Sequence, residues 1–162
     1  MLKKIFYFVC FLILAFPMSV QAFIQSDGEA MEKTGQLQEL VDYDFFTLFN
    51  KSELIGMKLT DYNVLTAQYK QTAMSTIEIV QSSLGQIALV RNSVDLTDED
   101  KTLQINKAYQ DIDTALSSLN WQTVNYIYSL RAIMPTITYQ RFVKKFEAYY
   151  NSLKLTDSKI NI

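Results

Sequence analysis

Apolar and small side chains recur every three to four residues through the middle of the chain. This spacing, close to 3.5 residues, is typical of a helix that packs one stripe against another helix. A second apolar row lies on another face, so more than one neighbour is expected. The pattern predicts one long helix, about 50 Å at 1.5 Å per residue, as the spine of a bundle. The main row is Tyr62, Leu65, Tyr69, Ala73, Thr76, Val80, Ser83, Ile87, Val90 and Val94, and the second is Met74, Ile77, Leu84 and Ala88.

Before the spine, a polar stretch precedes a shorter helical pattern. Residues 23–35 carry few apolar side chains and are expected to form a flexible leader. Helical spacing follows over residues 37–49, with Leu37, Leu40 and Phe45 on one stripe. Polar residues at 50–52 and Gly56 interrupt it. A bend or loop is therefore predicted between this helix and the spine.

After the spine, an acidic segment closes one helix and opens the next. Thr97 is placed to cap the free N–H groups of a new helix, with Asp100 at the third position. The stripe then runs at least to Leu119. Residues 120–121 are either a short turn or part of a continuous helix that extends toward Pro135, where proline ends or kinks it.

The N-terminus has the pattern of a secretory signal peptide. Lys3 and Lys4 precede an uncharged apolar run over residues 5–16, followed by small residues at Val20 and Ala22. The run is shorter than the roughly 20 apolar residues that a membrane-spanning helix needs. We expect cleavage after Ala22 and a periplasmic or secreted mature protein. An uncleaved anchor is the alternative.

Composition favours a single all-helical domain. The mature chain of 140 residues contains no cysteine, because Cys10 lies in the leader, so packing alone must stabilise it. Gly and Pro are scarce, at four and two. The expected organisation is a signal peptide (1–22), a flexible leader (23–35), a helical bundle (36–155) and a C-terminal tail (156–162). The bundle is predicted to be all-α, with three or four helices running up and down around one long central helix.

The composition also excludes most catalytic chemistry. The chain has no histidine, which removes histidine-based nucleophile systems and ordinary zinc or haem sites. Carboxylate chemistry remains open, with Glu53 and Glu78 as candidates for a polysaccharide-cleaving enzyme. Residues 98–100 favour helix capping over calcium binding, because consecutive acids point in different directions. We expect no cofactor and no catalytic residue.

Charge divides the mature chain into two unequal parts. Residues 23–113 carry fifteen acids and seven bases, whereas residues 114–162 carry two acids and six bases. The basic segment either balances the acidic part of the bundle or meets an acidic partner or membrane surface. Nucleic acid is not expected, since the mature chain is net negative. Formation of a homo-oligomer is left open.

The C-terminal segment is the candidate interaction surface. Its stripe of Phe142, Phe146, Tyr149 and Leu153 is predicted to face the bundle. This would leave Arg141, Lys144, Lys145 and Tyr150 outward, where they could attract a partner with acidic groups. Aromatic residues are dense here, either as bundle core or as a binding surface.

Two resemblances bear on function. Leu96-Thr97-Asp98-Glu99-Asp100 resembles the Leu-Thr-x-x-Gln helix starts of the periplasmic Spy and CpxP family of chaperones and stress sensors, with Asp100 in place of glutamine. Helix capping accounts for these residues equally well. In architecture, an exported protein with a long helix is similar to minor pilus subunits of type IV secretion systems.

The pattern therefore favours an exported protein-interaction module that binds rather than catalyses. It would be an adaptor, a chaperone-like protein, a secretion-machine component or a toxin-neutralising protein. The alternatives are a small carboxylate-dependent envelope enzyme and a Spy/CpxP-like stress chaperone.

Overall fold

The computed structural model describes residues 24–156, which form helices and connecting turns without a strand. The α-helices are α2 (Asp27–Asp42), α3 (Met57–Asn92), α4 (Asp98–Leu130) and α5 (Thr136–Ser152). Two short 3-10 turns, η1 (Phe45–Leu48) and η2 (Lys51–Glu53), connect α2 to α3. The predicted all-α bundle with a long helix is confirmed. The expected signal peptide and most of the C-terminal tail lie outside the described residues.

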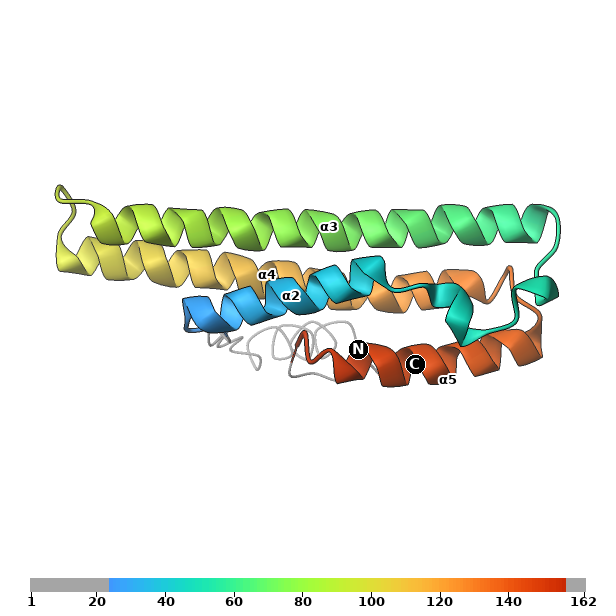
Figure 1. The fold of residues 1–162 in the computed structure, drawn as a ribbon. Helices are drawn as coiled ribbons and strands as arrows, with labels where there is room; N and C mark the ends of the chain where they lie inside the picture. The colour runs from blue at the N-terminus through green and yellow to red at the C-terminus, as the bar shows by residue number, and fades with distance from the viewer. Residues whose placement is uncertain (1–23, 157–162) are drawn as a thin grey trace, which may run out of the picture.

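Helices α3 and α4 form a long antiparallel hairpin, and α2 and α5 lie along it (Figure 1). The predicted spine, whose main row runs from Tyr62 to Val94, corresponds to α3, which begins at Met57 and ends at Asn92. Helix α4 passes through Asn120 and Trp121 without interruption, so the continuous alternative is the observed one. The bundle therefore has two long helices of similar length, 36 and 33 residues.

The buried face of α3 includes a row of side chains spaced seven residues apart. On α3, Tyr62, Tyr69, Thr76 and Ser83 are all buried at this spacing. Seven-residue spacing keeps one stripe facing its partner over the whole length of a helix pair. Tyr69 also stacks on Tyr126 of α4, with ring centroids 4.5 Å apart. The predicted period is thus the period of the buried face of α3, and Tyr69 on that face lies in the α3–α4 contact, which we call the α3–α4 seam.

Local signals set the ends of α3 and α4. The Thr97 side chain accepts from the Asp100 N–H at 3.1 Å and its hydroxyl donates to the Asp100 carboxylate at 2.7 Å, so the predicted cap is confirmed. At the other end of the hairpin, Gly56 precedes α3 with φ of +57°, a conformation that favours glycine. The predicted interruption before the spine is observed, but it begins at Tyr43, where α2 ends, so the helical spacing expected over residues 43–49 is wrong.

The flexible leader predicted over residues 23–35 is wrong for most of its length. Helix α2 begins at Asp27, where Ser26 accepts from the Glu29 N–H at 3.2 Å. Its buried face is sparse, with Ala30, Leu37 and Leu40 and the stem of Lys33, whose ammonium donates to the Lys154 carbonyl. The helical domain thus starts before the expected boundary at residue 36.

Helix α5 is held against the bundle by aromatic packing. Phe146 makes an edge-on contact with Phe45 of η1, at 5.3 Å between ring centroids. Phe142 stacks on Phe146 at 5.5 Å and contacts the ring of Phe49 at 5.9 Å. Many rings are therefore core, whereas Trp121 and Tyr128 are exposed. The core alternative is confirmed for the buried rings, whereas a binding role for the exposed rings stays a prediction.

Among residues 24–156, the structure contains no helix with the length and hydrophobicity required to cross a bilayer.

Candidate functional site

A sharp turn between α4 and α5 creates the site. The chain leaves α4 at Leu130, and the Met134 N–H donates back to the Leu130 carbonyl at 2.9 Å. Pro135 then precedes α5 with extended backbone angles, and the Tyr139 N–H donates to its carbonyl at 2.9 Å. Proline suits this position because it fixes φ and needs no hydrogen-bond acceptor. As a result, the last turns of α4 and the first turns of α5 lie side by side (Figure 1).

A groove of about 470 Å³ runs between these two helix ends, and we call it the α4–α5 groove. Its apolar wall includes Tyr139 and Val143, both half-buried against the core. Tyr128 is 55% exposed, so much of its surface is available for contact. The lining residues are Tyr128, Arg131, Tyr139, Gln140, Val143, Lys144 and Glu147.

The groove combines this aromatic surface with positive charge. Arg131 and Lys144 contribute two exposed cations to the lining, against the single carboxylate of Glu147. Burial raises the pKa of the Tyr139 phenol, and the nearby Arg131 charge opposes that shift. The Arg131 charge therefore lies close enough to the Tyr139 phenol in the groove wall to influence its pKa. A partner that places a carboxylate and an apolar side chain together would match this lining.

The four residues predicted to form an outward surface have different positions in the structure. Lys144 lines the groove, and Lys145 is exposed but lies outside the lining. Arg141 donates to both oxygens of Glu53, at 2.9 and 2.7 Å, and so fastens α5 to η2. Tyr150 is only 2% exposed, which makes its predicted outward position wrong.

Helix geometry explains the error at Tyr150. The positions 142, 146 and 150 follow each other at four-residue steps, and the Tyr150 ring stacks beside Phe146 at 6.0 Å. The neighbouring Tyr149, predicted to face inward, instead lies half-buried and stacks on Tyr43 at 3.8 Å. Steps of three and of four are both allowed on one helical face, so the spacing alone left the choice between two adjacent tyrosines undecided.

Three residues of the groove lining, Tyr128, Arg131 and Tyr139, were not among the predicted surface residues. A usable signal was present, because Tyr128 and Arg131 share one face at a three-residue spacing. Pro135 soon after them predicts that the next helix turns back, which brings Tyr139 close. The groove can be predicted only when the facing sides of α4 and α5 are considered together.

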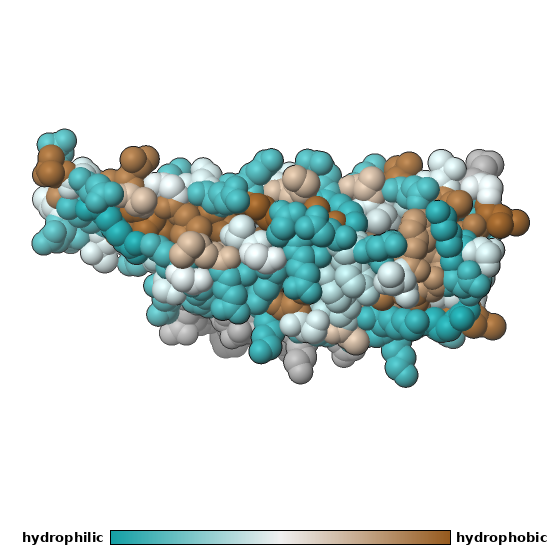
Figure 2. Space-filling view, viewed as in Figure 1, coloured by the Kyte–Doolittle hydropathy of each residue, from teal (hydrophilic) through white to brown (hydrophobic). Residues whose placement is uncertain are grey.

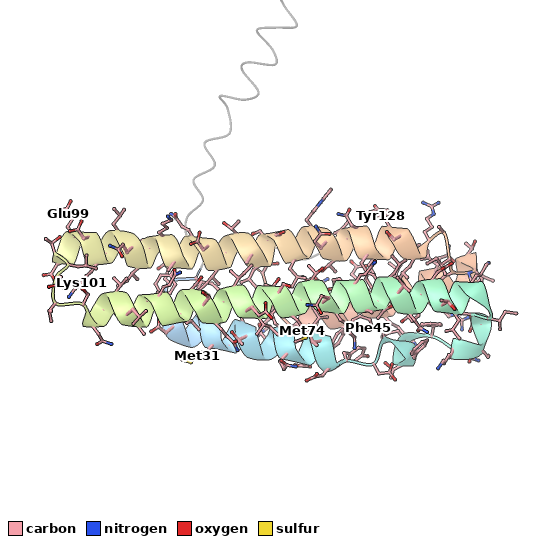
Figure 3. The ribbon with its side chains drawn as sticks, turned by 90° about the horizontal axis from the view of Figure 1, so that it is seen from above. Met31, Phe45, Met74, Glu99, Lys101 and Tyr128 are labelled. Atoms are coloured by element: carbon pink, nitrogen blue, oxygen red, sulfur yellow. The ribbon has the colours of Figure 1, made fainter. Side chains whose placement is uncertain are left out.

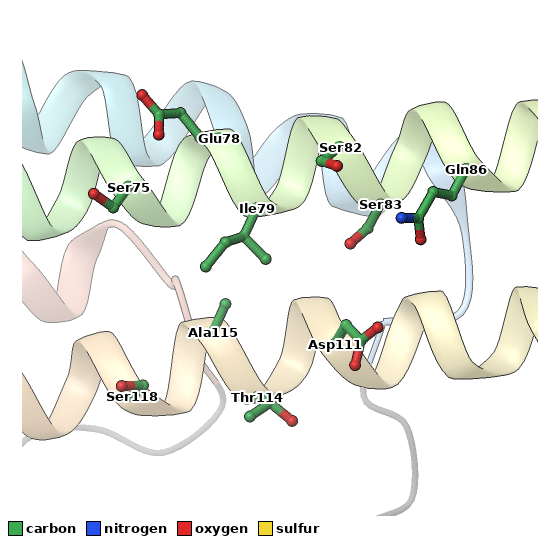
Figure 4. Close-up of a pocket in the computed structure, with 10 residues that line it drawn as sticks. All are labelled: Ser75, Glu78, Ile79, Ser82, Ser83, Gln86, Asp111, Thr114, Ala115 and Ser118. Atoms are coloured by element: carbon green, nitrogen blue, oxygen red, sulfur yellow. The ribbon is translucent and has the colours of Figure 1, made fainter.

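The two carboxylates considered for catalysis, Glu53 in η2 and Glu78 in α3, lie outside the α4–α5 groove lining. Glu53 accepts from the hydroxyl of Thr138 as well as from Arg141, and these contacts lower its pKa although desolvation opposes them. Glu78 and Asp111 border a shallow groove of about 730 Å³ on the open side of the α3–α4 seam. In Figure 4 the Glu78 side chain points away from Asp111 and α4. Serine and threonine make up much of the remaining lining.

Within residues 24–156, no cluster of three or more carboxylate, cysteine or histidine side chains is arranged to hold a metal ion. The acidic residues 98–100 occupy the first turn of α4, where the positive end of the helix dipole favours negative charge.

The chain matches no protein-family model, no curated protein and no solved structure.

Proposed function

We propose that this protein is an exported interaction module that binds an acidic protein segment in the α4–α5 groove. The observation that carries the proposal is the exposed Tyr128 ring beside two cations in a preformed groove. Tyrosine and arginine are, with tryptophan, enriched among the residues that dominate the binding energy of protein interfaces. Cations around such a ring steer an acidic partner and raise its association rate.

Export is part of the same proposal. The signal pattern of residues 1–22 predicts removal of the leader and a mature chain that starts at Phe23. In support, the described core includes Ile24, which is fully buried and would be the second residue of the mature chain. The functional domain would therefore lose no described core residue when the leader is removed.

Charge reversal in the groove tests the proposal. In the variant Arg131→Glu/Lys144→Glu, both groove cations become carboxylates. Both side chains are exposed and neither has an ion pair among the described residues, so helix content and melting temperature should change little. Cross-linked envelope extract should yield a salt-sensitive partner with the wild type and lose it with this variant.

The matched control is Lys58→Glu/Lys145→Glu, which changes the net charge equally but alters residues outside the groove lining. Lys145 is the immediate neighbour of Lys144, so the comparison separates the groove from helix α5 as a whole. The control should retain the partner. Equal capture by wild type and groove variant would contradict the proposed function.

A further inference from the structure

The end of the α3–α4 hairpin projects beyond α2 (Figure 1). Counted from the projecting end, the first hairpin side chains that bond to α2 are those of Arg91 and Tyr109. Both contact Asp27 at the start of α2. Residues 98–108 of α4 precede Tyr109 and span about 16 Å at 1.5 Å per residue. We call the projecting loop over residues 93–97, with the adjacent helix turns, the hairpin tip.

Apolar side chains are exposed at the hairpin tip. Val94 is 92% exposed, Leu89 is 75% exposed and Leu103 is 70% exposed. Figure 2 shows hydrophobic residues gathered over the hairpin where α2 does not cover it. Exposed apolar groups that gather at one projecting end often mark a contact with another molecule.

The same tip is strongly acidic. Between Ser93 and Asp100 the chain has four carboxylates, all of them exposed, and the adjacent helix turns add two cations, Arg91, which bonds to Asp27, and Lys101. Asp100 forms the helix cap with Thr97, which leaves Asp95 and Glu99 free to vary without loss of the cap. The tip therefore presents an apolar side chain, Val94, next to the Asp95 carboxylate.

This chemistry is complementary to the α4–α5 groove described above. The tip offers an aliphatic group with carboxylates, and the groove offers aromatic rings with Arg131 and Lys144. The two surfaces lie at opposite ends of α4, the tip at its start and the groove at its end. Figure 3 shows Glu99 at one end of the helix and Tyr128 toward the other. The 30 residues between Asp98 and Tyr128 span about 45 Å, so a copy cannot fill its own groove.

We propose that the hairpin tip of one copy docks in the α4–α5 groove of a second copy. Val94 would contact the Tyr128 ring, while Asp95 and Glu99 meet Arg131 and Lys144. The inference rests on the proposed function, since it names the partner of that same groove. Two copies can exchange tips in a closed pair, or successive copies can continue into a chain.

Paired charge reversals test this contact in the mature chain, residues 23–162. The tip variant is Asp95→Lys/Glu99→Lys, and the groove variant is Arg131→Glu/Lys144→Glu. Each variant alone would place like charges against each other. In an equimolar mixture, the reversed tip meets the reversed groove, and the native tip meets the native groove. Two variants that fail separately should therefore associate when mixed.

Sedimentation velocity at rising protein concentration and low salt is the readout. We expect self-association of the wild type, weakened about tenfold or more in each variant, restored in the mixture and reduced by added salt. The control Lys58→Glu/Lys145→Glu should associate like the wild type. Circular dichroism should show unchanged helix content in every variant.

A wild type that stays monomeric throughout would overturn the inference, as would a mixture that associates no better than its components. Continued association of the tip variant alone would also overturn it, because the contact would lie elsewhere. These outcomes are separable from the proposed function. A monomeric wild type that still captures an envelope protein through Arg131 and Lys144 refutes only the second-copy contact.

Discussion

The phenol hydroxyl of Tyr69 on α3 donates to the hydroxyl oxygen of Thr123 on α4, with 2.8 Å between the oxygens. The direction follows from Thr123, whose single hydroxyl proton goes to the Leu119 carbonyl at 2.8 Å. Both side chains are buried, so the bond joins the two long helices away from solvent. Burial also raises the pKa of the Tyr69 phenol well above its ordinary value, which keeps the donor protonated.

Tyr69→Phe should therefore destabilise the bundle. Removing the donor deletes a neutral buried hydrogen bond, worth about 0.5–1.5 kcal/mol of unfolding free energy. Urea unfolding followed by circular dichroism measures the loss. Tyr62→Phe is the matched control, because Tyr62 is buried seven residues earlier on α3 and its hydroxyl has no hydrogen-bond partner among the described residues. The control should lose nothing, and equal losses in both variants would contradict the assignment.

The contact between Glu53 and Arg141 predicts a specific response to acid. The Thr138 hydrogen bond and the Arg141 charge lower the Glu53 pKa in the folded state from its ordinary value of 4.5. A lowered pKa stabilises the fold above the unfolded-state value, and this contribution is lost as pH falls through the folded-state value. Wild type should therefore lose stability below about pH 5 partly through this carboxylate.

Glu53→Gln should be less stable than wild type at neutral pH and should show a flatter decline in acid. Urea unfolding at several pH values between neutral and about 3 provides the comparison. The control Glu78→Gln removes an exposed carboxylate that has no hydrogen bond or ion pair to the described residues, and should follow the wild-type curve. If Glu53→Gln also follows that curve, the contact has no energetic role.

A buried carboxylate on α4 anchors the start of the domain. Asp113 accepts from the Ile24 N–H at 3.0 Å, across 89 residues of sequence, and both residues are buried. Asp113→Ala should cost about 1–3 kcal/mol, since it leaves a buried donor without this acceptor. Asp113→Asn retains an acceptor and should cost less. Asp111→Ala, two residues away and exposed, is the control.

The hydrogen-exchange rate of the Ile24 amide is a second measurement. A loss of global stability alone would not accelerate this amide selectively. The Ile24 amide should exchange faster in Asp113→Ala than the other slow amides of the same variant. Uniform acceleration of all amides would instead indicate general destabilisation, and would argue against a specific bond from Asp113 to Ile24.

Features that depend on one helix were accessible from the sequence. The row containing Tyr62, Tyr69 and Val80 identified the buried face of α3, because seven-residue spacing allows only one such face. The cap at Thr97 was accessible for a similar reason, since a hydroxyl and an acid three residues apart satisfy free N–H groups locally.

Features that depend on contacts between distant segments could not be predicted from the sequence. Helix α2 has a weak apolar stripe and includes Gly28 and Gly35, so its sequence alone favours disorder. Tertiary contacts stabilise it, as Asp27 bonds to both Arg91 and Tyr109. The α4–α5 groove was missed for the same reason, because Tyr128 and Tyr139 meet only after the chain reverses at Pro135.

The burial of Ile24 leads to a prediction about processing. Val20 and Ala22 predict cleavage at the bond before Phe23, which would retain Ile24 in the mature chain. Burying an isoleucine stabilises a fold by about 1.5–3 kcal/mol, so a chain that starts at Gln25 should be less stable by at least this amount. It would also lose the Ile24 N–H that bonds to Asp113.

Intact mass and N-terminal sequencing of exported protein should give Phe23 as the first residue, and urea unfolding should rank the chain from Phe23 above the chain from Gln25. Exported protein that keeps its first 22 residues would refute the cleavage prediction, whereas equal stability of the two shorter chains would refute the anchoring role of Ile24.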